Sequence, residues 1–262
     1  MNSHRAGQMA GLIAPLAAAL ACPVGQAQAA PARNIVLVHG AFLDGSGWRP
    51  VYDILTRDGY HVSIVQAPLT GLADDVAATR RILDLQTGPV ILVGHSYGGA
   101  IITEAGSNPK VVGLVYIAAH APDVGETQSA NAKNYPALGR EAITPVGTGY
   151  VWIAPARFHA EFAADLSAEE AGFEACSQMP TAAIGFSTPI STAAWRTKPT
   201  WYMVAGADHI INPDLERMYA IRAHSRKVVE VAGASHSVYR SHPQEVAALI
   251  EEAAHAVDDA PH

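Results

Sequence analysis

The sequence contains little cysteine and has no concentration of basic residues. Two of its 262 residues are cysteines, and 17 Lys and Arg are set against 24 Asp and Glu, for a formal net charge of −7. An acidic chain without a Lys/Arg cluster is a poor candidate for binding nucleic acid or an anionic membrane. No Cys/His spacing typical of a zinc site is present either. We therefore expect the partner to be a small molecule.

A hydrophobic run long enough to span a bilayer is also missing. The first 29 residues place Arg5 ahead of a short Ala/Leu-rich stretch, which ends in Ala27-Gln28-Ala29. This order is typical of a secretory signal peptide with a small-residue cleavage site. We predict cleavage after Ala29, with Ala30 as the second choice, and a mature protein that is periplasmic or secreted. An uncleaved anchor helix is the alternative, and the apolar run is short for it.

The two cysteines lie on opposite sides of this cleavage site. Cys22 belongs to the predicted signal peptide, where a lipoprotein reading is possible although residues 19–21 fit a lipobox poorly. Only Cys176 remains after cleavage, which excludes an intrachain disulfide in an oxidising compartment. Stability must come from an ordinary hydrophobic core, and residues 30–262 are long enough for one domain.

Short runs of β-branched and apolar residues alternate with segments of helical periodicity. This alternation predicts a mostly parallel α/β sheet with helices on both faces, because strands apolar on both sides must be covered twice. The expected strands are residues 34–39, 61–68, 89–94, 111–119, 199–206 and 227–233, and the expected helices are 48–60, 72–86, 97–106 and 242–257. In the second helix, Asp74 and Asp75 fall in the first turn, where negative charge suits the helix dipole.

One segment interrupts the alternation. From about residue 125 to 196 no clean strand is visible, and helical pieces at 155–166 and 167–176 are separated by Pro and Gly. Because this segment lies between two strands of the sheet, we interpret it as an inserted helical cap.

The stretch VILVGHSYGGA carries the first chemical signal. Gly94-x-Ser96-x-Gly98 follows a buried strand and precedes a helix, which is the pattern of a nucleophile elbow. In such an elbow the serine adopts a strained backbone conformation, and the small residues let strand and helix approach closely. The alternative is a plain strand–turn–helix joint, since short glycine patterns also arise by chance.

An acid and a base follow the serine in the order that this architecture requires. Asp208 comes directly after the strand at 199–206, and His236 follows the last strand. Ser96, Asp208 and His236 therefore all lie at the carboxyl ends of strands, where the functional groups of parallel sheets gather. Asp123 also follows a strand and is a rival acid. Asp214 lies at a helix start, where an N-capping role is the simpler interpretation.

An oxyanion formed by attack of the serine needs two backbone N–H donors. We predict that Tyr97, the residue after the nucleophile, supplies one and that Ala41 supplies the other, with Phe42 as the neighbouring candidate. The Tyr97 ring would be free to shape the pocket. His39 and His95 flank the two turns and are better explained as structural hydrogen-bonding groups.

Taken together, "VLVHGA", "VILVGHSYGG", "VYIAAHAPD" and "GADHIINPDLER" resemble, in order and spacing, the landmarks of the serine α/β-hydrolases. The similarity is to the single-domain esterases, which include plant methyl esterases, hydroxynitrile lyases and bacterial carboxylesterases. It implies an α/β-hydrolase fold, Ser96 as nucleophile, Asp208 as acid and His236 as base. It also implies Ala41 and Tyr97 as oxyanion donors, no metal and no organic cofactor.

The resemblance also separates the possible reactions. Hydroxynitrile lyases place a hydroxyl residue where this chain has Gly40 and use a cap lysine, for which only Lys133 is available before Lys198. Epoxide hydrolases and dehalogenases of this fold use an aspartate in the position of Ser96. We therefore predict a serine esterase that cleaves a small-to-medium carboxylic ester through an acyl-enzyme.

Three other functions remain open. A lactonase, for example one acting on acyl-homoserine lactones, or a cofactor-free perhydrolase or haloperoxidase would use the same triad. A non-catalytic ligand-binding protein is a more distant alternative. The aromatic residues of the cap and its surroundings predict an apolar pocket, for which the candidates are Phe42, Trp152, Phe158, Phe186 and Trp195.

Overall fold

The computed structural model of the protein describes residues 1–2 and 32–258. Its centre is a six-stranded sheet in the order β2-β1-β3-β4-β8-β9, in which every neighbouring pair is parallel. The strands are β1 (Asn34–Val38), β2 (His61–Val65), β3 (Val90–Ser96), β4 (Val111–Ala119), β8 (Thr200–Ala205) and β9 (Lys227–Val231). All six strands predicted from the apolar runs are present.

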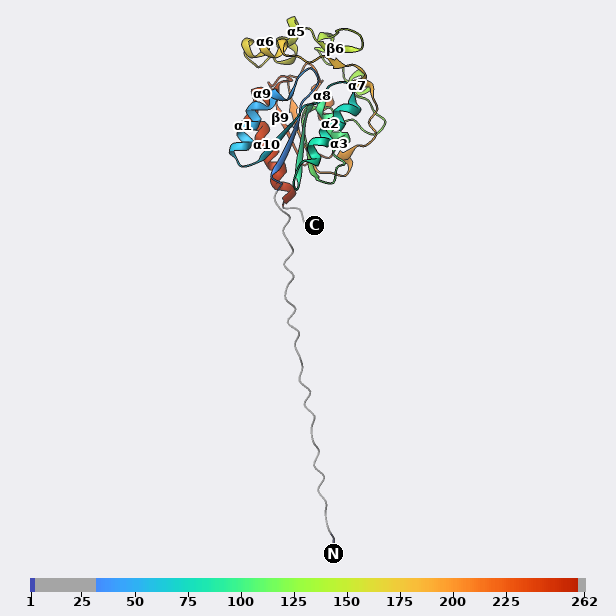
Figure 1. The fold of residues 1–262 in the computed structure, drawn as a ribbon, viewed down its shortest axis with the longest axis vertical. Helices are drawn as coiled ribbons and strands as arrows, with labels where there is room; N and C mark the ends of the chain where they lie inside the picture. Colours follow the sequence, from blue (N-terminus) through green and yellow to red (C-terminus); the bar gives the residue numbers. More distant parts are fainter. Residues whose placement is uncertain (3–31, 259–262) are drawn as a thin grey trace.

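The central strands are buried along their whole length. Every residue of β1, β3 and β8 is buried, whereas the edge strands β2 and β9 consist mostly of half-buried and exposed residues. Parallel strands of this kind need a layer of helices on each face. Figure 1 shows these layers: α1 and α10 lie on one side of the sheet, and α2, α3 and α8 lie on the other.

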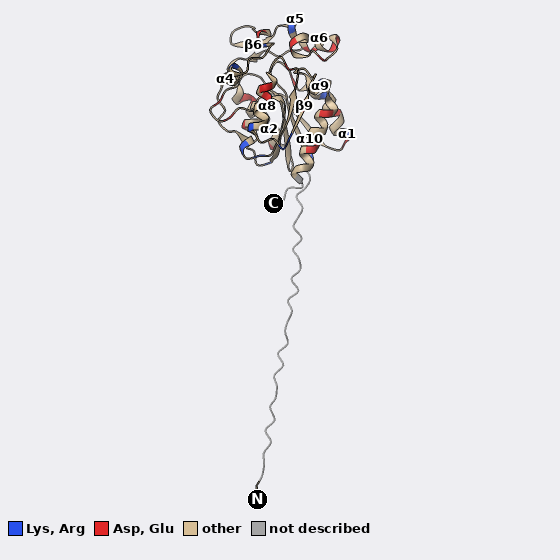
Figure 2. Cartoon of the chain, turned by 180° about the vertical axis from the view of Figure 1, so that it is seen from behind, with Lys and Arg blue, Asp and Glu red and all other residues tan. Residues whose placement is uncertain are grey.

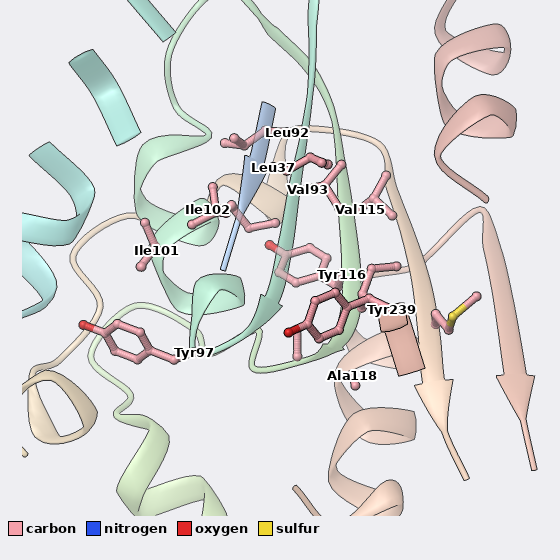
Figure 3. Packing of buried hydrophobic residues seen from close by; sticks show 14 of the residues in the cluster. Leu37, Leu92, Val93, Tyr97, Ile101, Ile102, Val115, Tyr116, Ala118 and Tyr239 are labelled. Carbon is pink, nitrogen blue, oxygen red and sulfur yellow. The ribbon is translucent and has the colours of Figure 1, made fainter. Parts of the chain in front are cut away.

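Four helices around the sheet are close to their predicted positions: α1 (Arg49–Arg57), α2 (Leu72–Asp84), α3 (Gly98–Ala105) and α10 (Pro243–Asp258). The structure adds α8 (Pro213–Arg222), α9 (Val238–Ser241) and a 3-10 turn η1 (Gly45–Trp48) ahead of α1. Figure 3 shows the core where β3 and β4 pack against α3 and α9, with Leu92, Val93 and Val115 on the strands.

The segment between β4 and β8 covers one end of the sheet, with α5, α6 and β6 above the carboxyl ends of the strands (Figure 1). It contains α4 (Gln128–Asn134), η2 (Arg140–Ala142), β5 (Ile143–Pro145), β6 (Tyr150–Ile153), α5 (Pro155–Phe162), α6 (Ala168–Cys176), β7 (Thr181–Ala182), α7 (Ile184–Ser187) and η3 (Ala194–Arg196). We call this segment the cap.

The expectation of a cap without strands is wrong. β5, β6 and β7 form a three-stranded antiparallel sheet. Each of these strands has only two to four residues, which is too short for a period-two pattern to be recognised in the sequence.

The predicted signal peptide, residues 1–29, lies almost entirely outside the described residues, so export stays a prediction. Among the residues that are described, no helix is both long and apolar enough to cross a membrane.

Candidate active site

Ser96 occupies a sharp turn between β3 and α3. Its φ of 55° lies in the left-handed region, which is rare and strained for a residue with a side chain. A Cβ on Gly94 would lie 2.6 Å from the Gly98 carbonyl oxygen, and a Cβ on Gly98 would lie 2.7 Å from that of His39. The two glycines are therefore required by backbone contacts, and the arrangement is that of a nucleophile elbow.

Ser96, His236 and Asp208 form a continuous hydrogen-bonded chain. The Ser96 hydroxyl donates to His236 Nε2 at 2.8 Å, and His236 Nδ1 donates to Asp208 Oδ2 at 2.5 Å. Ser96 is the last residue of β3, and the other two residues come from loops that follow β8 and β9, strands that lie close to β3 in the sheet. The tertiary structure thus brings together the three residues that chain order had selected.

The Asp208 carboxylate is held by the loop in which it lies. Its Oδ1 accepts the backbone N–H groups of Ile210 at 2.6 Å and Ile211 at 2.9 Å. Asp208 and His236 are both shielded from solvent. Because Oδ1 is used by the backbone, Oδ2 is left for the histidine, which fixes the imidazole with its proton on Nδ1 and its acceptor nitrogen toward Ser96.

A second carboxyl group, Glu216, lies beside Asp208. This side chain on α8 is fully buried, and its Oε2 accepts the Ala205 N–H at 3.0 Å. Burial and the negative charge of Asp208 raise the pKa of Glu216 well above its ordinary value of 4.5. Oε1 is buried without a donor among the described residues, so a proton on this oxygen lets Glu216 donate toward Asp208.

The N–H groups predicted to form the oxyanion hole are free of protein acceptors. Among the described residues, neither Ala41 N–H nor Tyr97 N–H donates a hydrogen bond, and both residues line the cavity that contains Ser96. The N–H of Phe42, the neighbouring candidate, donates to Thr181 Oγ1 at 2.9 Å. This contact removes Phe42 from consideration and favours Ala41. Gly40 must stay small, because a Cβ there would lie 2.8 Å from the Ser96 Cβ.

The Tyr97 ring is fixed, so the expectation of a free ring is wrong. Its hydroxyl donates to Asp75 Oδ2 at 2.7 Å, and its ring packs edge-on against Phe186. Figure 3 shows Tyr97 extending away from Tyr116 and the strand core. Asp75 is fully buried, also accepts the Leu69 N–H at 2.7 Å, and has a pKa raised by burial. Asp75 therefore anchors Tyr97 from inside the protein instead of serving mainly the helix dipole.

The other histidines that flank the site make structural hydrogen bonds. His95 Nε2 donates to the His236 carbonyl oxygen at 2.9 Å, and His39 Nδ1 donates to the Gly40 carbonyl oxygen at 2.8 Å. Burial lowers the pKa of both imidazoles. These bonds agree with the structural interpretation of both residues.

The rival acids lie in surface contacts. Asp123 pairs with Arg196 at 2.7 Å, and Asp214 pairs with Arg217 at 2.5 Å. The N-cap of α8 is Asn212, whose Oδ1 accepts the Asp214 N–H at 2.9 Å. The N-capping role proposed for Asp214 is therefore wrong, because the capping position precedes Pro213.

Asp165 of the cap holds the loop that carries His236. The sequence patterns did not single out this aspartate. Its carboxylate accepts the Ser235 N–H at 3.0 Å, the Ser235 hydroxyl, and the Ser241 hydroxyl at 2.7 Å. The Ser237 N–H donates to the Phe162 carbonyl oxygen at 3.1 Å, and the Phe162 ring packs edge-on against His236. The loop is therefore tied to the cap on both sides of the histidine.

A cavity of about 360 Å³ opens above Ser96. Phe42 and Phe186 line it, as predicted, together with aliphatic residues of the cap and of the loop after β8. The prediction is wrong for the three other aromatic residues. Phe158 is buried and stacks on Phe162, Trp195 donates from Nε1 to the Pro122 carbonyl oxygen, and Trp152 packs against the core from β6. Aromatic character alone did not distinguish the cap interior from the cavity wall.

His120 also lines this cavity and was missed. It follows β4 directly, and its N–H donates to the Ser96 carbonyl oxygen at 3.1 Å. Burial and the neighbouring His236 lower the pKa of the His120 imidazole to about 3, so this ring is neutral at ordinary pH. The rule that selected Asp208, a polar residue just past a strand's carboxyl end, could have found it.

No cluster of three or more His, Cys, Asp or Glu suited to a metal ion occurs in the part of the chain that the structure describes.

Comparison with known proteins gives the family. The model of the alpha/beta hydrolase family matches residues 35–249, which is most of the chain. The chain belongs to this family. The match includes Ser96, Asp208 and His236.

Relatives of this α/β hydrolase include esterases and hydrolases. A carbendazim hydrolyzing esterase of Nocardioides sp. (strain SG-4G) is 35% identical over 113 residues, which span 37% of this chain and 46% of that protein. A pyrethroid hydrolase from Sphingobium faniae JZ-2 has a similar structure, with a TM-score of 0.73, 24% identity and coverage of 86% of this chain and 98% of that one. A methylesterase from Arabidopsis has a TM-score of 0.71, with 18% identity and coverage of 85% and 99%. At these identities the structural likeness establishes the fold.

Proposed function

We propose that this α/β hydrolase is a serine esterase that cleaves small-to-medium carboxylic esters through Ser96, His236 and Asp208. The observation that supports this most directly is the 2.8 Å hydrogen bond from Ser96 Oγ to His236 Nε2, continued by the 2.5 Å bond to Asp208. A serine hydroxyl is a weak nucleophile until a base takes its proton. Here His236 lies within hydrogen-bonding distance of the Ser96 hydroxyl, and Asp208 orients the imidazole.

The reaction would proceed in two halves. Ser96 attacks the ester carbonyl carbon while His236 Nε2 accepts its proton, and Asp208 stabilises the resulting imidazolium. The N–H groups of Ala41 and Tyr97 would stabilise the negative charge on the carbonyl oxygen. His236 then gives the proton to the leaving alkoxide, which departs as the alcohol. Water activated by His236 repeats the attack on the acyl-enzyme and releases the acid.

The relatives and the cavity support a small-molecule ester as substrate. The printed names of the relatives include an esterase, a methylesterase and a pyrethroid hydrolase, and a cavity of about 360 Å³ lies at the small end of the range for ligand pockets. Lactone opening would use the same steps, so a substrate panel should contain both esters and lactones of graded acyl length.

Ser96→Ala tests the proposal. We expect it to lower kcat by about four orders of magnitude or more, as in other triads that lose the nucleophile, while circular dichroism stays unchanged. A fluorophosphonate probe should label the wild type at Ser96 and leave Ser96→Ala unlabelled. Ser107→Ala, a change at an exposed serine after α3, is the matched control and should retain both properties.

Two outcomes would contradict the esterase proposal. Ester turnover that survives in folded Ser96→Ala would show that another group acts as nucleophile. A wild type that neither turns over esters and lactones nor reacts with the probe would favour a non-catalytic binding protein.

A further inference from the structure

We propose that the catalytic cavity selects esters that carry a neutral hydrogen-bonding group, an amide or a hydroxyl, and that the side-chain amide of Gln128 binds this group. The inference rests on the proposed esterase function and defines its substrate class. It follows from an unpartnered polar side chain in the wall of an otherwise largely apolar cavity.

Gln128 is the first residue of α4 and lines the cavity together with Ser96. Its side chain is only 2% exposed, yet Oε1 is buried with no donor, and no hydrogen bond of the described chain involves its amide group. Protein interiors satisfy almost all buried polar groups, because an unpaired amide loses its bonds to water without replacement. Oε1 is shielded from the cavity as well, so a bound substrate would meet this amide through its NH₂ group, which has no acceptor among the described residues.

Further polar groups lie around Gln128. Ser129 and Tyr135, which also come from the α4 segment, line the same cavity, and their hydroxyl groups have no hydrogen-bond partner among the described residues. His120 closes this side, with its Nδ1 3.5 Å from Tyr219 Oη, and that oxygen accepts Asn131 Nδ2 at 3.0 Å. Figure 2 shows α4 on the same side of the sheet as α2 and α8. We call these polar residues of the cavity lining, Gln128, Ser129, Tyr135 and His120, the α4 patch.

The bound group should be neutral. Burial and His236 keep the His120 imidazole uncharged, and Gln128 and Ser129 carry no charge. Among the residues that line the cavity, Arg140 is the cationic one, and it is exposed at the surface. A buried carboxylate or ammonium on the substrate would lack a counter-charge at the α4 patch, which makes its burial costly. An amide or a hydroxyl needs only the hydrogen bonds that the α4 patch offers.

Most of the remaining wall is apolar. Phe42, Phe186, Val151 and Ile143 line the cavity with Ile210 and Leu215. A hydrocarbon part of the ester would pack against these side chains, and the polar group would point toward α4. The substrate thus combines an apolar part with a hydrogen-bonding part, and the two are joined through the ester.

Two pairs of esters with chains of equal length test the inference. In the first pair, p-nitrophenyl acetamidobutanoate is compared with p-nitrophenyl heptanoate; in the second, acetamidoethyl butanoate is compared with pentyl butanoate. The two pairs place the amide on the acyl and on the alcohol part, respectively. Gln128→Leu removes the amide at similar size, and Asn134→Leu, an exposed position on α4 outside the cavity, is the matched control.

We expect the wild type to prefer the amide-bearing ester of at least one pair in kcat/KM. Gln128→Leu should lower that preference about tenfold, the effect of losing one hydrogen bond. Asn134→Leu should keep the wild-type preference. A wild type that prefers the hydrocarbon ester in both pairs, or a preference that Gln128→Leu leaves unchanged, would overturn the inference.

The failure of the esterase proposal is a separate result. A wild type that cleaves none of the four esters and does not react with the fluorophosphonate probe would overturn the proposed function and, with it, this inference. A strong preference for a carboxylate-bearing ester that Arg140→Ala abolishes would overturn the inference alone, because it would assign the cavity to an anionic substrate.

Discussion

Glu216→Gln should make the protein more stable at neutral pH, by an amount that increases with pH. Glu216 is buried beside Asp208, and its pKa is raised well above the ordinary 4.5. The folded protein therefore holds this proton more tightly than the unfolded chain does. As pH rises above the ordinary pKa, the unfolded chain loses the proton first, and the free energy of unfolding decreases.

The magnitude follows from proton linkage. Between the ordinary and the raised pKa, the free energy of unfolding of the wild type decreases by up to about 1.4 kcal/mol per pH unit relative to a variant without this proton. Glutamine keeps the acceptor for the Ala205 N–H and places its NH₂ group where Oε1 lies, facing Asp208. As pH rises above the ordinary pKa, the gap between the two proteins should therefore widen by up to about 1.4 kcal/mol, or roughly 3–6 °C in Tm, per pH unit.

Thermal and urea unfolding of both proteins at several pH values is the assay. The raised pKa values of Asp75, Glu174 and Glu251 affect wild type and variant alike, so the difference between the two curves reports on Glu216. Glu230→Gln is the control, because Glu230 is exposed and its pairing with Arg217 lowers its pKa. The difference in the free energy of unfolding between Glu230→Gln and the wild type should therefore not grow in favour of the variant as pH rises.

Two results would refute this reasoning. A stability gap that does not change with pH would mean that Glu216 holds no extra proton in the folded protein. A Glu216→Gln variant that is less stable than the wild type at neutral pH would mean that Glu216 is ionised and held by a donor.

Two further predictions concern the groups that position the site. Asp165→Ala should lower kcat roughly 10–100-fold with little change in KM, because it frees the His236 loop and misplaces the base. Asp165→Asn should lower kcat by a smaller factor. Equal kcat in the wild type and both variants would exclude a positioning role for Asp165. Tyr97→Phe should lower the free energy of unfolding by about 1.5–3 kcal/mol, since Asp75 loses a buried donor. Its kcat should stay within a few-fold of the wild type, because the backbone N–H at this position is unchanged. Equal denaturant midpoints for the two proteins would contradict the predicted loss of stability.

Much of the fold could be read from local patterns. The strands at 34–38, 90–96, 111–119 and 200–205 are apolar on both faces, and such runs have few alternatives to a doubly covered parallel sheet. The short strands of the cap left no such signal, because two to four residues are below the length at which a period is visible. Their pairing depends on contacts with distant residues, such as Phe42 with Thr181.

The triad candidates could be selected because each follows a strand in the order that the architecture requires. The sequence could also exclude an aspartate nucleophile at position 96, since this depends only on residue type and position.

Tertiary structure decided what surrounds these residues. Chain order says nothing about which side chains approach from the cap or from α8, so Asp165 and Gln128 of the cap and Glu216 of α8 became visible only in three dimensions. Burial also separated residues of the same type: Asp75 anchors Tyr97 from the interior, whereas Asp123 is a surface ion pair. Residue type and order determined the chemistry that Ser96, His236 and Asp208 can perform; long-range packing decided how the three are held and what the cavity above them accepts.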